Sequence, residues 1–116
     1  MTLDDLQREL SLKLVTKGTN LDRPVTGCYA SDLLSWVMGH AEENQVWITI
    51  QSHPNIVAVA ALLGLAGIIV AEGVEIDEDT IKKAEEENVP IFSSEKPIYE
   101  ICGILYNTLS RSYKKC

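Results

Sequence analysis

The chain is poor in cysteine and has no long uninterrupted apolar run, and each shortage argues against a class of protein. Its three cysteines, Cys28, Cys102 and Cys116, are odd in number and widely spaced, which fits reduced thiols better than a disulfide framework. The longest apolar stretch, residues 56–71, contains two glycines and is short for a membrane span. The acidic start also differs from the basic and then apolar plan of a signal peptide. We therefore expect a cytoplasmic protein with one domain, residues 1–116.

Basic residues are also scarce, because 10 Lys and Arg face 17 Asp and Glu, for a net charge of −7. This balance argues against nucleic acid as the main partner. No glycine is followed by lysine, so the Gly-Lys-Ser/Thr loop that holds nucleotide phosphates in many kinases is missing. The spacing of Cys28, His40, His53 and Cys102 matches no zinc pattern. We expect neither a metal nor a cofactor, and we assign no catalytic residue.

What the chain does have is a regular alternation of short apolar strands and helical stripes. The run "GIIVA" shows no polar alternation, which is typical of a parallel strand covered on both faces. A strand followed by a helix, repeated along a chain, implies right-handed crossovers. The sequence therefore predicts an α/β fold with three layers, α/β/α, and a mostly parallel sheet. After a first helix and a half-buried strand at residues 11–15, the main strands are expected near residues 25–29, 46–50, 67–71 and 90–92.

Polar residues mark the starts of the predicted helices. Ser31 is expected to cap the helix after the second strand, with Asp32 in its first turn. The central helix is expected to begin at Pro54, with Ser52 or His53 as its cap.

A ligand pocket is expected where the carboxyl ends of the strands meet, because α/β sheets bind ligands at that edge. The N-termini of helices there offer backbone N–H groups to an anion. The cluster Gln51–Asn55 should line this pocket together with residues from the other strands. The predicted ligand-binding residues are Thr26, Gly27, Ser31, Asp32, Gln51, Ser52, His53, Asn55, Glu72 and Gly73.

Two other interpretations of these residues stay open. The serines can be helix caps and nothing more, and Cys28 can be a small core residue. Alternatively the protein is a small enzyme in which His53 works with Asp32 or Glu72 as an acid–base pair.

The helix expected at residues 54–65 has no charged side chain and is apolar around its whole circumference. A helix on the surface of a small domain normally keeps a polar stripe. We therefore expect a homodimer, or docking onto another protein, through this helix. The alternative is that the first helix, with Leu3, Leu6 and Leu10, covers it.

Four segments in this order resemble the DRTGG domain family over roughly residues 22–109. They are "VTGCYASDLLSWVM", "VWITIQSHPNIVAVA", "LAGIIVAEG" and "KAEEENVPIF". The resemblance implies a regulatory or interaction module that binds a small anionic ligand, such as a nucleotide, or a partner enzyme. Similar domains occur alone, often encoded near iron hydrogenase components, or beside CBS domains in inorganic pyrophosphatases and at the front of phosphotransacetylases.

The family resemblance carries over to particular residues. Thr26 and Gly27 match the family's Thr-Gly step, residues 31–35 match its helix start, and Gln51, His53 and Asn55 match its central loop, with Gly73 at the turn after the fourth main strand. This chain departs from the family at Cys28, where a second glycine is usual. The fold is similar to the N-terminal domain of HPr kinase/phosphorylase, so such proteins are sometimes labelled serine kinases; the missing phosphate loop argues against that label here.

Overall fold

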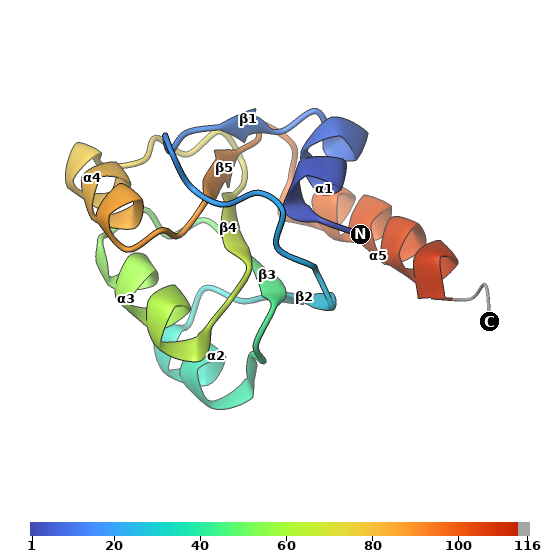
Figure 1. Cartoon of the computed structure of the whole chain (residues 1–116), viewed down its shortest axis with the longest axis horizontal. Coiled ribbons are helices and arrows are strands. Elements are labelled where there is room, and N and C mark those ends of the chain that lie inside the picture. The colour runs from blue at the N-terminus through green and yellow to red at the C-terminus, as the bar shows by residue number, and fades with distance from the viewer. Residues whose placement is uncertain (114–116) are drawn as a thin grey trace.

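A computed structural model describes residues 1–113, with side chains as far as residue 110; Cys116 lies outside the described residues. The described residues form five helices and five strands in the expected order, with two strands in succession after the first helix (Figure 1). The elements are α1 (Leu3–Leu10), β1 (Lys13–Leu14), β2 (Gly27–Ala30), α2 (Leu34–His40), β3 (Gln45–Thr49), α3 (Asn55–Leu63), β4 (Gly67–Val70), α4 (Glu78–Glu86), β5 (Ile91–Ser93) and α5 (Ile98–Tyr113).

The five strands form one sheet in the order β1-β5-β4-β3-β2. Strands β2 to β5 are parallel to one another, whereas β1 pairs with β5 in the antiparallel direction. The chain therefore enters the sheet at one edge, crosses to the other edge for β2, and returns strand by strand. This arrangement confirms the prediction of a mostly parallel sheet.

Two apolar clusters cover the two faces of the sheet, which confirms the three layers. On one face, α1 and α5 pack over alternate residues such as Ile48, Ile69 and Phe92. On the other face, α2, α3 and α4 pack over the residues between them, such as Trp47 and Ile68. All four residues of β4 are buried, as expected for a strand with helices on both sides.

The central helix α3 lies on the face opposite α1, so the first helix does not cover it. It packs between α2 and α4 (Figure 1), and this packing uses Ile56, Val57 and Ala60, which are buried. Its outer side exposes Leu62, at 70% of its surface. The apolar circumference is thus explained mainly by contacts within the chain. None of the helices within residues 1–113 is long and apolar enough to cross a membrane.

Leu6 tests the packing of α1 on the α5 face. Its side chain is fully buried, so Leu6→Ala should lower the free energy of unfolding by about 2–5 kcal/mol, through lost burial and the cavity left behind. Glu9, in the same helix, is exposed, and Glu9→Ala should change stability by less than about 0.5 kcal/mol. Urea unfolding followed by circular dichroism measures both. Equal effects of the two substitutions would contradict the described packing.

Candidate functional site

The predicted residues after β2 and β3 do lie together at the carboxyl edge of the sheet. The backbone N–H of Ser31 donates to the carbonyl of Ile48 at 3.2 Å, so the two strands still run side by side where they end. The amide Nε2 of Gln51 donates to the backbone carbonyl of Asp32 at 3.0 Å. Ser31, Asp32 and Gln51 therefore form one continuous polar group.

Asp32 holds this group together. Its Oδ1 accepts hydrogen bonds from Thr49 Oγ1 at 2.8 Å and from the backbone N–H of Ile50 at 2.9 Å. Thr49 is buried, and its hydroxyl oxygen also accepts from the backbone N–H of Gln51 at 3.1 Å. The carboxylate thus satisfies a buried hydroxyl and a strand end, which is a structural role.

The expected capping role of Ser31 is wrong. Helix α2 begins at Leu34 with Leu33 as its N-cap, and no side chain caps it. Ser31 Oγ instead accepts from the backbone N–H of Leu33 at 3.2 Å. The reason is Asp32, whose bonds to β3 hold this segment against the strand and delay the start of the helix.

The residues before α3 also bond mostly to their own surroundings. The N-cap of α3 is Pro54, without a side-chain hydrogen bond, so Ser52 does not cap the helix. The carbonyl of Ser52 accepts from Thr80 Oγ1 of α4. His53 Nδ1 accepts from the backbone N–H of Asn55 at 3.2 Å, which satisfies one amide at the start of the helix.

Glu72 and Gly73 form a tight turn after β4, with positive φ angles of 64° and 68°. Their backbone N–H groups donate to the carbonyls of Lys96 and Ser94, each at 3.0 Å. Glu72 Oε2 accepts from the backbone N–H of Ile98 at 2.9 Å. Glu72 therefore caps α5 from a neighbouring strand, and the turn after β4 is joined to the segment before α5.

These bonds change the expected chemistry of the edge. Amides at the starts of α3 and α5 already bond to His53 and Glu72, so they are not the open anion site that helix N-termini can supply. The proposed acid–base pair also finds no support, because His53, Asp32 and Glu72 each bond to a different group.

Thr26 and Gly27 lie at the opposite, amino end of β2. The backbone N–H of Thr26 donates to the carbonyl of Asn44 at 3.0 Å, and its hydroxyl donates to the carbonyl of Glu43 at 3.3 Å; both acceptors precede β3. The expectation that Thr26 and Gly27 share one pocket with Gln51 and Glu72 is therefore wrong. The physical reason is that β2 itself separates its two ends.

A polar pocket of about 480 Å³ lies where β4, β5 and β1 meet. Two lysines and three serines line it, together with one glutamate, one valine and the turn glycine. Of the predicted site residues only Gly73 lines it directly, and Glu72 is its neighbour. The lining residues are Ser11, Lys13, Gly73, Val74, Ser93, Ser94, Glu95 and Lys96.

The two lysines were not predicted from the sequence. Lys13 pairs with Ser93 in the antiparallel β1–β5 ladder, so the first residue of β1 reaches the edge where the parallel strands end. Only the direction of β1 brings it there, and the sequence pattern does not give that direction. Lys96 could have been predicted from the sequence, because it follows the serines at the end of β5 by two residues.

A second cavity of about 480 Å³ lies between β2 and α5. Its described lining residues are all uncharged: Thr26, Gly27, Cys28, Ala30, Ile48, Cys102, Leu105, Tyr106, Leu109 and Ser110. Burial, and then the neighbouring Cys102, raises the pKa of Cys28 to about 12, and burial also raises the pKa of Cys102. Both thiols are neutral at physiological pH and behave as small apolar groups.

Within the described residues, no group of three or more His, Cys, Asp and Glu side chains is placed to hold a metal ion.

Comparison with known proteins gives one family and one fold. The model of the DRTGG domain family matches residues 5–108, which is most of the chain. No curated protein matches the chain. A similar solved structure is the crystal structure of the CBS and DRTGG domains of the regulatory region of Clostridium perfringens pyrophosphatase, complexed with the activator diadenosine tetraphosphate. It is 14% identical, has a TM-score of 0.68, and the match covers 90% of this chain and 45% of that one. This chain therefore corresponds to less than half of that structure.

Asp32→Ala tests the structural role of the carboxylate. Because it removes two hydrogen bonds and leaves the buried Thr49 hydroxyl with one acceptor fewer, we expect a loss of about 1–3 kcal/mol in unfolding free energy. Asp32→Asn keeps an acceptor oxygen and should lose less. Asp22→Ala, at an exposed loop position, is the control and should be close to neutral. A neutral Asp32→Ala would show that these bonds do not hold the edge.

The raised pKa of Cys28 predicts a loss of stability at alkaline pH. An unfolded thiol ionises near its ordinary pKa of 9.0, whereas the folded thiol keeps its proton up to about 12. The unfolded state is therefore favoured as pH rises between these values, by up to about 1.4 kcal/mol per pH unit. Unfolding by urea from pH 8 to pH 11 should show a weaker pH dependence for Cys28→Ala than for the wild type. Identical slopes would contradict the burial of this thiol.

Proposed function

Because the chain belongs to the DRTGG domain family, we propose that it is a non-catalytic regulatory module that binds a small anionic ligand, with nucleotides as the leading class. The fold likeness to a regulatory region complexed with a nucleotide activator supports this proposal. The observation in this chain that carries it is the polar pocket with Lys13 and Lys96.

The lining of this pocket suits a phosphorylated ligand better than any other surface described here. Two ammonium groups face one carboxylate, Glu95, so the pocket carries a local positive charge in a protein of net charge −7. The hydroxyls of Ser93 and Ser94 can donate hydrogen bonds to phosphate oxygens. A volume of about 480 Å³ is within the usual range for small-molecule sites.

The predicted residues further along the edge, from Ser31 to Asn55, remain candidates for the rest of the ligand. Gln51, His53 and Asn55 lie at the ends of neighbouring elements, and His53 and Asn55 are exposed. A nucleoside is longer than its phosphate and can extend from the lysines toward them. Their role as ligand contacts stays a prediction.

A ligand bound in this pocket can affect how the start of α5 is held. The pocket is lined by Gly73 and Lys96, and the turn that contains Gly73 holds the start of α5 through the bond from Ile98 to Glu72. A ligand that orders these two segments therefore changes how firmly the last helix is held. This coupling suits a regulatory module, whose task is to report binding.

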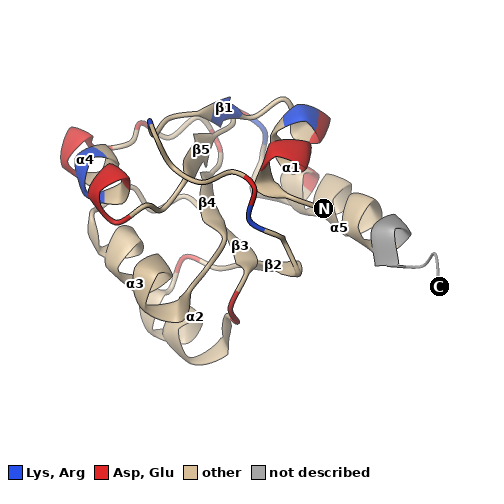
Figure 2. Ribbon diagram, in the orientation of Figure 1, with Lys and Arg blue, Asp and Glu red and all other residues tan. Residues whose placement is uncertain are grey.

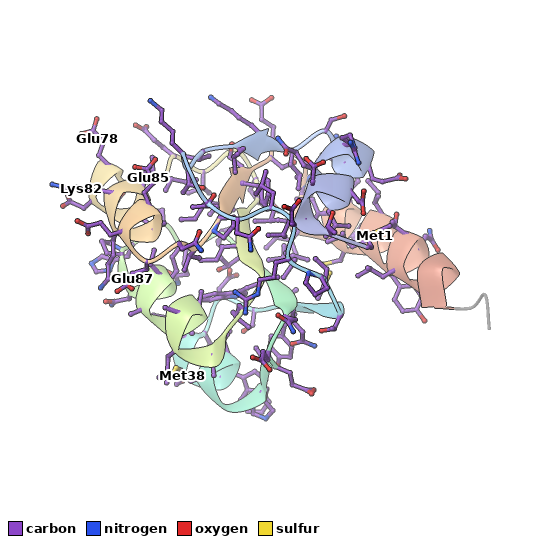
Figure 3. The ribbon with its side chains drawn as sticks, in the orientation of Figure 1. Met1, Met38, Glu78, Lys82, Glu85 and Glu87 are labelled. Carbon is purple, nitrogen blue, oxygen red and sulfur yellow. The ribbon has the colours of Figure 1, made fainter. Side chains whose placement is uncertain are left out.

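The outer surfaces of α2 and α3 are the proposed contact for a partner protein. Figure 2 shows no charged residue on either helix, in contrast to α1 and α4. Trp36 and Leu62 are exposed there, and Figure 3 shows Met38 at the outer side of α2. Exposed apolar groups gathered on one side of a domain are typical of an interaction surface. The sequence first predicted a homodimer through residues 54–65 and, as a second possibility, a partner enzyme; we propose the partner enzyme for this surface, and the homodimer through it stays the alternative.

A thermal-shift experiment with diadenosine tetraphosphate, ATP and inorganic phosphate tests the ligand site. A ligand that binds only the folded protein raises the melting temperature with concentration, so we expect a rise with at least one nucleotide. The double substitution Lys13→Gln and Lys96→Gln should abolish that rise, because it removes both positive charges. No product should form from the nucleotide, as followed by chromatography.

Lys82→Gln is the matched control, since Lys82 projects from α4 away from the sheet (Figure 3) and does not line the pocket. It removes one positive charge from the protein and should leave the thermal shift unchanged. If Lys82→Gln also loses the thermal shift, the effect of the lysine substitutions comes from the net charge of the protein and not from the pocket. Turnover of a nucleotide by the wild type would contradict the non-catalytic role.

A further inference from the structure

Strand β2 leaves one edge of the sheet open. Its only neighbour in the sheet is β3, and no other strand within residues 1–113 pairs with it. Since the backbone N–H of Ser31 bonds to Ile48 of β3 in register with the β2–β3 ladder, and backbone groups alternate in direction along a strand, Cys28 and Ala30 turn their N–H and C=O groups outward. Such an edge pairs readily with another strand.

The same strand forms one wall of the uncharged cavity described above, and α5 forms the other wall. Cys28 and Ala30 of β2 face Leu105 and Leu109 across it. Helix α5 extends past the sheet on the side of β2 (Figure 1). An added strand would therefore bond to the edge of β2 and close the cavity from the side.

The outward side of α5 is unusual for a helix exposed to solvent. Tyr99 and Tyr106 are 91% and 75% exposed, and Gly103 between them has nothing within 4 Å of the place where a Cβ would stand. The three residues are spaced by four and three positions, so they share one side of the helix. This stripe offers two aromatic rings and a close approach to the backbone.

We propose that a second copy of this chain occupies this surface, with the two β2 strands paired antiparallel about a two-fold axis to make one sheet of two domains. The axis is perpendicular to the sheet, so both α5 helices lie on the same face and contact each other through Tyr99, Gly103 and Tyr106. A second copy related by a 180° rotation presents the same strand edge and the same helix stripe. It can therefore pair with β2 and contact α5 at the same time.

The direction of the backbone groups sets the register. With Tyr29 opposite Tyr29 of the second copy on the axis, Cys28 lies opposite Ala30 of the second copy, and these are the residues whose N–H and C=O groups point outward. Each such pair exchanges two hydrogen bonds, as in any antiparallel ladder. Tyr29 is then at a non-hydrogen-bonded position.

Charge also favours a second copy at this edge. An interface about a two-fold axis brings groups near the axis against their own copies, so like charges there repel. Strand β2 and the described cavity lining carry no charge. The opposite edge strand, β1, carries Lys13, and α1 and α4 are strongly charged (Figure 2). Of the two edge strands, β2 is the one without a charged residue.

Ala30→Pro tests the strand pairing with Ala30→Ser as its matched control. Proline removes the outward N–H and is tolerated on an edge strand when that group faces away from the sheet. Serine keeps the N–H, and Ala30 is exposed, so a small side chain is accommodated there. Sedimentation at micromolar concentration should show a dimer for the wild type and for Ala30→Ser. Ala30→Pro should raise the dissociation constant roughly tenfold or more, because two hydrogen bonds are lost per dimer.

Two glutamate substitutions locate the interface on one helix or the other. Tyr106→Glu places like charges together across the proposed contact and should dissociate the dimer. Leu62→Glu, at a similarly exposed position on α3, should not. Circular dichroism checks that each variant is folded. The proposal is overturned by a monomeric wild type, by a Leu62→Glu monomer with dimeric Tyr106→Glu and Ala30→Pro, or by equal effects of proline and serine at Ala30.

Discussion

The burial of β3 and β4 on both faces is the constraint on which the rest of the structure depends. Trp47, Ile48, Ile68 and Ile69 are fully or almost fully buried, and they alternate between the two apolar clusters. A sheet with such a centre is stable only if helices cover both sides. Covering it leaves polar side chains at the two ends of the strands and at the outer edges of the sheet. The candidate sites are therefore confined to those margins.

The fold was largely predictable because the spacing of apolar residues along the sequence depends directly on which faces of an element are buried. The unalternating "GIIVA" encodes a strand that is covered on both faces, and it was placed correctly as β4. Cap positions were less predictable, because a serine before a helix has several possible acceptors and donors. Ser31 does not cap α2 because Asp32 bonds to Thr49, a residue 17 positions away. No local pattern contains that partner.

The candidate site was predicted only in part, for a topological reason. The sequence pattern correctly indicated that the ends of β2 and β3 meet, since parallel strands end at one edge. It gave neither the antiparallel direction of β1, which brings Lys13 to Ser93, nor the order of the strands. Thr26 and Gly27 were assigned to the wrong edge, because residues near a strand in sequence can lie at either of its ends. The acidic residues at the carboxyl edge turn out to hold the structure, and the basic ones give the pocket its charge.

The pairing of the first and last segments of the chain has a consequence for its synthesis. Strand β1 pairs only with β5 in the sheet, and α1 packs in the same apolar cluster as Ile101, Leu105 and Leu109. A ribosome makes residues 1–14 first, yet their partners emerge about eighty residues later, after β2 to β4 and their helices. During that interval α1 can contact only the part of its cluster that β3 and β4 supply, such as Ile48 and Ile69, and it lacks the cover of β5 and α5. The packing of α1 is therefore completed only after α5 has been made, although α1 itself is among the first elements of the domain to be synthesised.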